Sequence, residues 1–237
     1  MKSKHKYFFW DIVNLAIFYS AFLCFFVTSI ITIVDFVAGR VGLSMLIYSL
    51  FFNIALCTPF FIKKIFKVTF SPVVSIVFYL YMFVTAFLGV ELHFYSKIAI
   101  WDILVHFLMG MLLSVLSIYI LNITVYKKDI GKHNLGFTAI FMISFAVTAG
   151  VLWEIGEFLV DMIFDSGFQR YITYGGTLLV GQAALIDTMV DLVVDFAGAL
   201  VGIGFVLIAL KVDKNFLKTF RVKKAKREYA EIEDIEE

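Results

Sequence analysis

The chain has 237 residues, of which 62% are apolar and 16% are charged, and its formal net charge is +1. Soluble domains carry about 45–50% apolar and about 25% charged residues, so the composition excludes a globular cytosolic enzyme. No nucleic-acid partner is expected. With 28 Phe and only two Pro, the chain favours long helices in lipid over a β-barrel or a disordered chain.

Six stretches of the chain are long and apolar enough to cross a bilayer as helices, which takes about 20 residues each. Polar or glycine-bearing breaks separate them. The predicted spans are residues 8–34, 41–62, 70–90, 101–126, 136–164 and 187–210. The sequence therefore predicts an all-α integral membrane protein with six transmembrane helices, formed by residues 1–210.

The distribution of Lys and Arg predicts the orientation of these helices. Of the 20 basic residues, 17 lie in the N-terminus, the second loop, the fourth loop and the tail; the other three are Arg40, Lys97 and Arg170. Cytoplasmic segments of membrane proteins collect positive charge. Both termini are therefore expected in the cytoplasm, with the protein in the cytoplasmic (inner) membrane of a bacterium.

Three further features are expected to carry no chemistry. The first apolar run is too long for a signal peptide and is expected to be a permanent anchor. Residues 211–237 form a charged cytoplasmic tail, whose basic part either rests on anionic head groups or is solvated. Cys24 and Cys57 fall inside predicted helices and are expected to pack as apolar side chains rather than to form a disulfide.

Acidic residues gather in the outer halves of the last three predicted helices. Three sets lie at helical spacing, namely Glu154, Glu157 and Asp161; Asp187, Asp191 and Asp195; and Asp102 with His106. Each set occupies one helix face. An Asp near the centre of a membrane helix costs about 2.5–3.5 kcal/mol to insert, so these faces are expected to line an interior site. The site-bearing part of the chain is 90–210, and the site opens away from the cytoplasm.

Glycines lie close to the acidic faces. Gly198 and Gly202 continue the face of the last helix, and Gly150 precedes Glu154 by one turn. Small residues let helix backbones approach closely. Either this approach brings the acids together, or the glycines serve ordinary helix packing.

Carboxylates this close cannot all ionise in a low dielectric, so they share protons, bind cations or do both. Oxygen ligands with one imidazole suit Mg²⁺, Mn²⁺ or Ca²⁺, with Zn²⁺ as an alternative. The expected metal ligands are Glu154, Glu157, Asp187, Asp191 and His106. Alternatively, acids such as Asp161 and Asp187 lie at wet helix ends, buried acids hold helices together, or His106 is structural.

The loop 165–186 either dips over the site as a short re-entrant lid or is an ordinary connection. Within it, Gln169 and Arg170 are candidate residues for binding a cofactor or substrate group. The Arg170 guanidinium is suited to pair with a carboxylate or to hold a phosphate. Glu91 and His93, near the outer end of the third span, are weaker candidates.

Short motifs in residues 90–210 follow one another in a characteristic order. They are Trp101-Asp102-x3-His106-x3-Gly110, Trp153-Glu154-x2-Glu157-Phe158, Gly167-x-Gln169, and Asp187-Thr188-x2-Asp191 followed by Gly198-Ala199. In this combination the chain resembles the YjdF-like family of multi-pass bacterial membrane proteins, and more distantly the VanZ-like teicoplanin-resistance proteins. The resemblance implies a multi-pass membrane fold and supplies no reaction.

These residues suggest an enzyme as the first hypothesis. It is a metal-assisted hydrolase or transferase of a lipid or lipid-linked substrate at the outer leaflet. In this hypothesis Glu154, Glu157 and Asp191 hold the metal. His106 or Asp102 is the general base.

Two other functions are considered. One is a proton- or cation-coupled transporter or flippase, which is disfavoured because the first three helices contribute almost no interior polar residues. The other is a scaffold that affects envelope stress or antibiotic tolerance through partner helices. Membrane lipid and a small-molecule or lipid-linked substrate are the expected partners, and the oligomeric state is left open.

Overall fold

A computed structural model describes most of the chain. The described residues are 2–66, 68–69, 72–126, 134–164, 166–172, 177–220 and 223–224. The predictions for Asp165, for the basic residues of the fourth loop at 127–133 and for the tail from residue 225 fall outside these residues.

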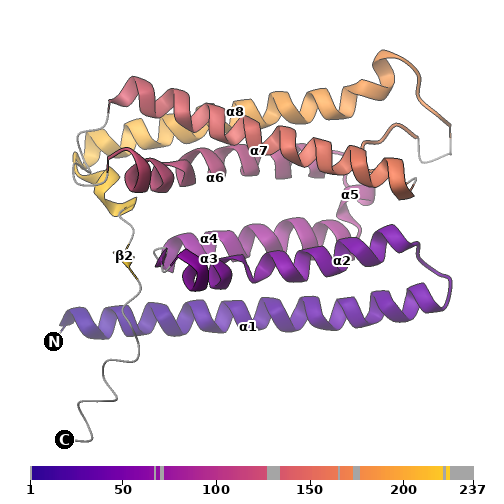
Figure 1. Ribbon diagram of the computed structural model, residues 1–237, viewed down its shortest axis with the longest axis horizontal. Helices are drawn as coiled ribbons and strands as arrows, with labels where there is room; N and C mark the ends of the chain where they lie inside the picture. The colour runs from indigo at the N-terminus through magenta and orange to yellow at the C-terminus, as the bar shows by residue number, and fades with distance from the viewer. Residues whose placement is uncertain are drawn as a thin grey trace, which may run out of the picture.

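The fold consists of long helices whose axes are roughly aligned and whose chain directions alternate (Figure 1). The N-terminal part holds α1 (Lys2–Val37), α2 (Leu43–Leu56), α3 (Thr58–Phe66), α4 (Pro72–Met82), the π-helix η1 (Phe83–Glu91) and α5 (Phe94–Lys97). The C-terminal part holds α6 (Trp101–Thr124), α7 (Leu135–Phe164), α8 (Gln182–Val212) and the 3-10 helix η2 (Phe216–Phe220). Two-residue strands, β1 (Val68–Thr69) and β2 (Lys223–Lys224), pair antiparallel. The prediction of a helical protein is confirmed.

Five of the described helical segments are long and apolar enough to cross a membrane. They are Leu15–Val37, Val73–Glu91, Trp101–Thr124, Leu135–Phe164 and Gln182–Val212. The predicted second span, residues 41–62, is divided between α2 and α3, and its apolar helix Met45–Leu56 is shorter. Pro59 explains the division, because proline has no backbone N–H to donate and its ring crowds the carbonyl four residues earlier, that of Ala55. The sixth membrane crossing stays a prediction.

The last helix begins earlier than predicted. α8 starts at Gln182 rather than at residue 187, so Asp187 lies in its second turn and not at its N-terminus. Residues 166–172 and 177–181 form irregular structure, in which Ile172 and Leu178 make an isolated antiparallel bridge. Within its described residues the loop is irregular up to Gly181 and continues as the first turn of α8, and residues of 166–172 line the cavity described below.

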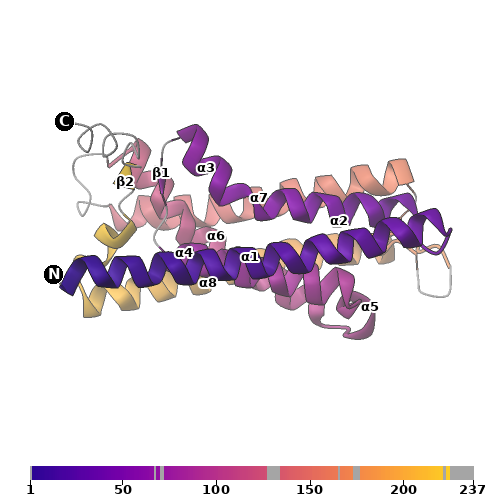
Figure 2. The ribbon, with the colours of Figure 1, turned by 90° about the horizontal axis from the view of Figure 1, so that it is seen from below.

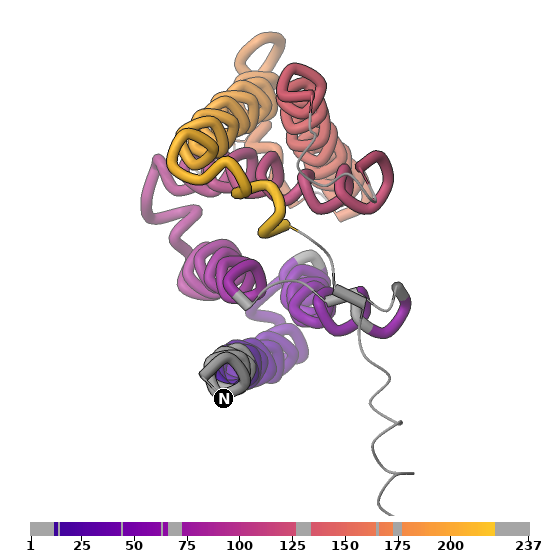
Figure 3. The backbone as a smooth tube through the Cα atoms, turned by 90° about the vertical axis from the view of Figure 1, so that its left-hand side faces the viewer, coloured from indigo at the N-terminus to yellow at the C-terminus, as the bar shows by residue number. Residues whose placement is uncertain are grey.

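The helices are arranged as two halves. Figures 1 and 2 show α1, α2 and α4 side by side, and Figure 3 shows them end-on, apart from α6, α7 and α8. The N-terminal half packs around Phe25 and Leu56, and the C-terminal half around Ile118 and Met142. The short helix α5 lies in the connection from η1 to α6. Each half therefore has a core of its own.

The beginning of the predicted tail packs against the C-terminal half. In η2, Leu217 and Phe220 are buried, and Phe220 contacts Tyr119 edge-on. The Asn122 side chain donates hydrogen bonds to the carbonyls of Leu217 and Phe220. The residues up to Phe220 are thus part of the folded bundle and not a free tail.

Close contact between α6 and α8 depends on glycines. A side chain at Gly110 would overlap the backbone of Asp195, and one at Gly198 would overlap the backbone carbonyl of Phe107. A side chain at Gly150 on α7 would overlap the Asp195 carboxylate. These positions hold three helices close enough for their acidic faces to meet, which supports the close-approach interpretation of the glycines.

We predict that Gly198→Ala destabilises the protein. Because the new methyl group would meet the Phe107 carbonyl, α6 and α8 must separate, at a cost of about 1–3 kcal/mol. Gly204→Ala is the matched control in the same helix, since no atom lies within 4 Å of a Cβ there. Unfolding in detergent should show a lower free energy of unfolding for Gly198→Ala alone. Equal stabilities would contradict the packing.

Candidate functional site

The imidazole of His106 is the centre of a buried acidic cluster. His106 lies on the interior face of α6 and is 3% exposed. Its Nδ1 is 3.4 Å from Oδ2 of Asp195 on α8, and its Nε2 is 3.8 Å from Oε1 of Glu154 on α7. The same Nε2 is 3.9 Å from Oδ1 of Asp102, one turn earlier on α6. All three C-terminal helices thus bring a carboxylate to this ring.

Two groups of donor atoms converge tightly enough to hold a cation. His106, Glu154 and Asp191 form one group, and Asp102, Asp187 and Asp191 form the other; within each, the atoms lie within 4.8 Å of one another. Asp191 belongs to both groups. The first group is buried in all three members, whereas the second is more accessible.

Buried oxygens in this cluster lack hydrogen-bond donors. No hydrogen bond of 3.5 Å or less reaches either carboxylate oxygen of Glu154 from the described residues; the Thr188 hydroxyl and the His106 ring, 3.8 Å away, are its polar neighbours. Oδ1 of Asp195, which is fully buried, likewise accepts none. A buried polar group without a partner is costly. The cluster as the described residues form it is therefore electrostatically incomplete.

Arg170 supplies a positive charge to the accessible group. Its Nη2 lies 3.1 Å from Oδ2 of Asp102, and its Nη1 lies 3.4 Å from Oδ1 of Asp187. The residue has a left-handed backbone conformation, with φ of 49°. The prediction that Arg170 pairs with an acid is consistent with this geometry, and the pair closes the accessible side of the cluster.

Asp161 holds the loop that carries Arg170. Its carboxylate accepts hydrogen bonds from Ser166 Oγ at 2.6 Å and from the backbone N–H groups of Phe168 and Gln169 at 2.8 and 2.9 Å. The Gln169 side chain in turn donates to Oγ1 of Thr188 on α8 at 3.2 Å. Asp161 thus lies apart from the His106 cluster and orders the loop beside it.

A cavity of about 760 Å³ lies between the two halves and ends at the cluster. Asp102, His106 and Glu157 contribute its polar end, together with Arg170. Helices α2, α4, η1 and α5 supply the opposite wall. Withdrawal from solvent raises the pKa of Tyr95, which lines the cavity from α5, well above its ordinary value. Its hydroxyl is therefore neutral and able to donate a hydrogen bond.

Glu157 differs from the other predicted ligands in its surroundings. Its Oε1 accepts a hydrogen bond of 3.0 Å from the indole Nε1 of Trp153, one turn earlier on α7. It lines the cavity and belongs to neither convergent donor group. Of the predicted ligands, His106, Glu154, Asp187 and Asp191 are brought together, and Glu157 lies beside them.

The first half contains a polar network that contradicts the expected scarcity of interior polar residues there. Ser49 on α2 contacts Ser29 on α1 at 2.8 Å and donates to Oε1 of Glu91 at 3.0 Å. Asn53 joins them through Ser29. Serine and asparagine are tolerated inside apolar helices when they find partners across helices, and such pairs leave little trace in hydropathy. Glu91 belongs to this network, whereas His93 lines the cavity.

Residues 15–212 match the family described as "Predicted membrane protein (DUF2238)". The chain belongs to this family. The expectation from the motifs is thereby confirmed at the level of a membrane-protein family. Nothing in the comparisons supports a similarity to the teicoplanin-resistance proteins.

One relative adds to this assignment. An "Uncharacterized protein" of Thermotoga maritima is 32% identical over 117 residues, which are 49% of this chain and 53% of that protein. The chain spans about half the length of the curated relative it matches. No solved structure matches the chain.

Sequence reasoning placed Asp195 on the interior acidic face and Trp153 in a motif, but it gave neither residue a role at the site. Asp195 touches His106, and its spacing of one turn from Asp191 was the available signal. Trp153 donates to Glu157 with the same spacing on α7. The aromatic residues of α2 that face the cavity gave no signal, because their position depends on how the two halves meet.

We predict that Asp161→Asn loosens the loop. Its carboxylate accepts two backbone N–H groups, and bonds to a charged acceptor contribute about 1.5–3 kcal/mol each. Amide hydrogen exchange at Phe168 and Gln169 should therefore accelerate about tenfold or more. Asp213→Asn is the control, because Asp213 accepts the Asn215 N–H far along the chain. Unchanged protection of Phe168 and Gln169 would contradict this role.

Proposed function

We propose that this protein binds a divalent cation inside the membrane and uses it in chemistry on a lipid or lipid-linked substrate. The supporting observation is the buried group of His106, Glu154 and Asp191, whose donor atoms lie within 4.8 Å of one another. Two carboxylates buried this close to one imidazole carry excess negative charge, and a bound cation would compensate it.

The proposal includes a topology of six crossings with both termini in the cytoplasm. In Figure 1, α1 begins and α8 ends at one end of the molecule, and α5 and the beginning of α6 lie at the other. α2 runs antiparallel to α1 and α4, which makes α2 with α3 the second crossing. With the excess of Lys and Arg on the cytoplasmic side, the site faces the outer leaflet of a bacterial cytoplasmic membrane.

The donor atoms suit several divalent cations. One imidazole and two carboxylates are acceptable to Zn²⁺ and Mn²⁺, and the oxygen-rich surroundings also suit Mg²⁺ and Ca²⁺. Asp195 contacts the Nδ1 side of the His106 ring and would orient the imidazole as a neighbour of the ligands. Glu157 lies outside the convergent groups and is assigned to the cavity instead.

The geometry supports a hydrolase or transferase. A divalent cation at this position supplies an activated water or polarises a substrate oxygen. Asp102 lies at the cavity, within reach of both His106 and Arg170, and is placed to accept a proton there. Arg170 pairs with Asp102 and Asp187 and is proposed to hold them beside the cavity.

We predict that purified wild-type protein retains about one divalent cation per chain. Glu154→Gln and Asp191→Asn each remove a ligand oxygen charge and should lower the bound metal at least tenfold. Asp35→Asn is the control, because Asp35 pairs with the exposed Arg40 instead. Elemental analysis of folded, monodisperse samples measures the metal. Wild-type protein that binds none of Mg²⁺, Mn²⁺, Ca²⁺ or Zn²⁺ in equilibrium dialysis would contradict the proposal.

A coupled transporter is the second candidate. The observation that favours it is the position of the cavity, which is lined by both halves and ends at the acidic cluster. Transporter sites commonly lie between two such units. An assay in sealed liposomes distinguishes the two candidate functions. A transporter moves the cation across the bilayer without altering any lipid. The enzyme alters a lipid without a net flux of the cation.

A further inference from the structure

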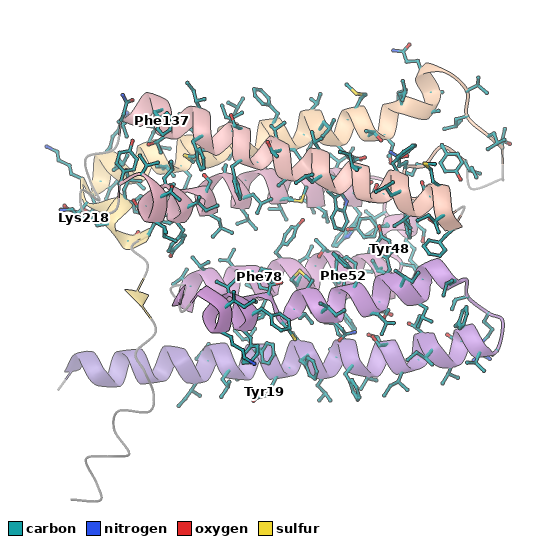
Figure 4. The ribbon with its side chains drawn as sticks, viewed as in Figure 1. Tyr19, Tyr48, Phe52, Phe78, Phe137 and Lys218 are labelled. Carbon is teal, nitrogen blue, oxygen red and sulfur yellow. The ribbon has the colours of Figure 1, made fainter. Side chains whose placement is uncertain are left out.

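Aromatic rings form much of the cavity wall. Tyr48 and Phe51 come from α2, Tyr81 from α4 and Trp153 from α7. Figure 4 shows Tyr48 between α2 and the C-terminal helices. The ring centroids of Tyr48 and Phe168 are 4.1 Å apart, and those of Phe51 and Trp153 are 6.4 Å apart. Phe52 contacts both Tyr48 and Phe51, so these rings form a continuous aromatic surface that joins the two halves.

Glu157 is the carboxylate associated with these rings. Its hydrogen-bond donor among the described residues is the neutral indole of Trp153. Arg170, the guanidinium that lines the same cavity, pairs with Asp102 and Asp187. No ion pair with Glu157 is found in the described part of the chain. A carboxylate beside aromatic faces attracts organic cations, because the ring faces are themselves electron-rich.

The size of the cavity limits the ligand. Its volume of about 760 Å³ holds about 25 non-hydrogen atoms, if each occupies roughly the 30 Å³ of a water molecule. That is enough for a small head group with one medium-length chain. A lipid with two long chains has about twice as many atoms and would not be enclosed.

We propose that the cavity binds an amphipathic organic cation, with its ammonium group at Glu157 against Trp153 and Tyr48. A single apolar chain extends along the aromatic surface. An ammonium group beside Glu157 would favour the ionised form of this carboxylate, and the ring faces of Trp153 and Tyr48 would hold the same group. As the substrate class of the proposed enzyme, this assignment rests on the proposed function; as a binding site, it is tested independently.

Isothermal titration calorimetry of the full-length protein in nanodiscs tests the proposal. The probes are octyltrimethylammonium, octyl sulfate and octyl glucoside, which share a chain and differ in head-group charge. We expect saturable binding of the ammonium, at least tenfold tighter than of either other probe. Glu157→Gln should weaken ammonium binding at least tenfold, and Trp153→Leu severalfold. Glu91→Gln, in the polar network of the N-terminal half, should bind as wild type does.

Equal affinity for the three probes in wild-type protein would overturn the proposal, without reference to any variant. Unaltered binding by a folded Glu157→Gln variant would overturn it as well. Tetramethylammonium provides the remaining comparison: binding as tight as that of the octyl probe would contradict the role of the apolar chain. Metal content is measured on the same samples, so that loss of ammonium binding with retained metal separates this inference from the proposed function.

Discussion

The burial of several carboxylates around one imidazole is the constraint on which the rest of the structure depends. The free energy of burying an isolated charge in a low-dielectric interior is strongly unfavourable unless the charge is paired. Here Asp102 and Asp187 are paired with Arg170, and Asp195 contacts His106. Glu154 lies 3.8 Å from the same imidazole, so that one ring faces several carboxylates. A further cation, a proton on His106 or protons shared among the acids would compensate the excess negative charge, and this is the basis for the proposed function.

The fold makes this cluster by bringing three helices unusually close. Gly110, Gly150 and Gly198 remove the side chains that would otherwise keep α6, α7 and α8 apart at the level of Asp195. Asp161 then fixes the loop from α7, and Arg170 reaches back over the acids from that loop. The N-terminal half contributes little charge to the cluster but supplies the aromatic wall in front of it. A polar centre and an apolar approach to it thus come from different halves.

Much of this arrangement was predictable because helices in lipid obey simple rules. Hydropathy located the long helices within a few residues. Helical spacing identified which acids lie on one face of each helix. The ends of helices were harder to predict. Examples are the break between α2 and α3 before Pro59 and the start of α8 at Gln182.

Other features depend on contacts between helices, which periodicity does not encode. The network of Ser29, Ser49 and Asn53 consists of short polar side chains that hydropathy treats as nearly neutral. The cavity exists only because the two halves meet along α2 and α7. Sequence alone also gave Glu157 the same role as Glu154, since both lie on one helix face. Their different neighbours, Trp153 and His106, distinguish them.

X-ray absorption spectroscopy of Mn²⁺-loaded protein tests the central claim most directly, because it reports the atoms around the metal. Ligation inside the cluster predicts one imidazole nitrogen among oxygen ligands, and loss of the imidazole scattering in His106→Gln. A spectrum with oxygen ligands alone, unchanged by that substitution, would place the metal elsewhere and contradict a cation site built around His106.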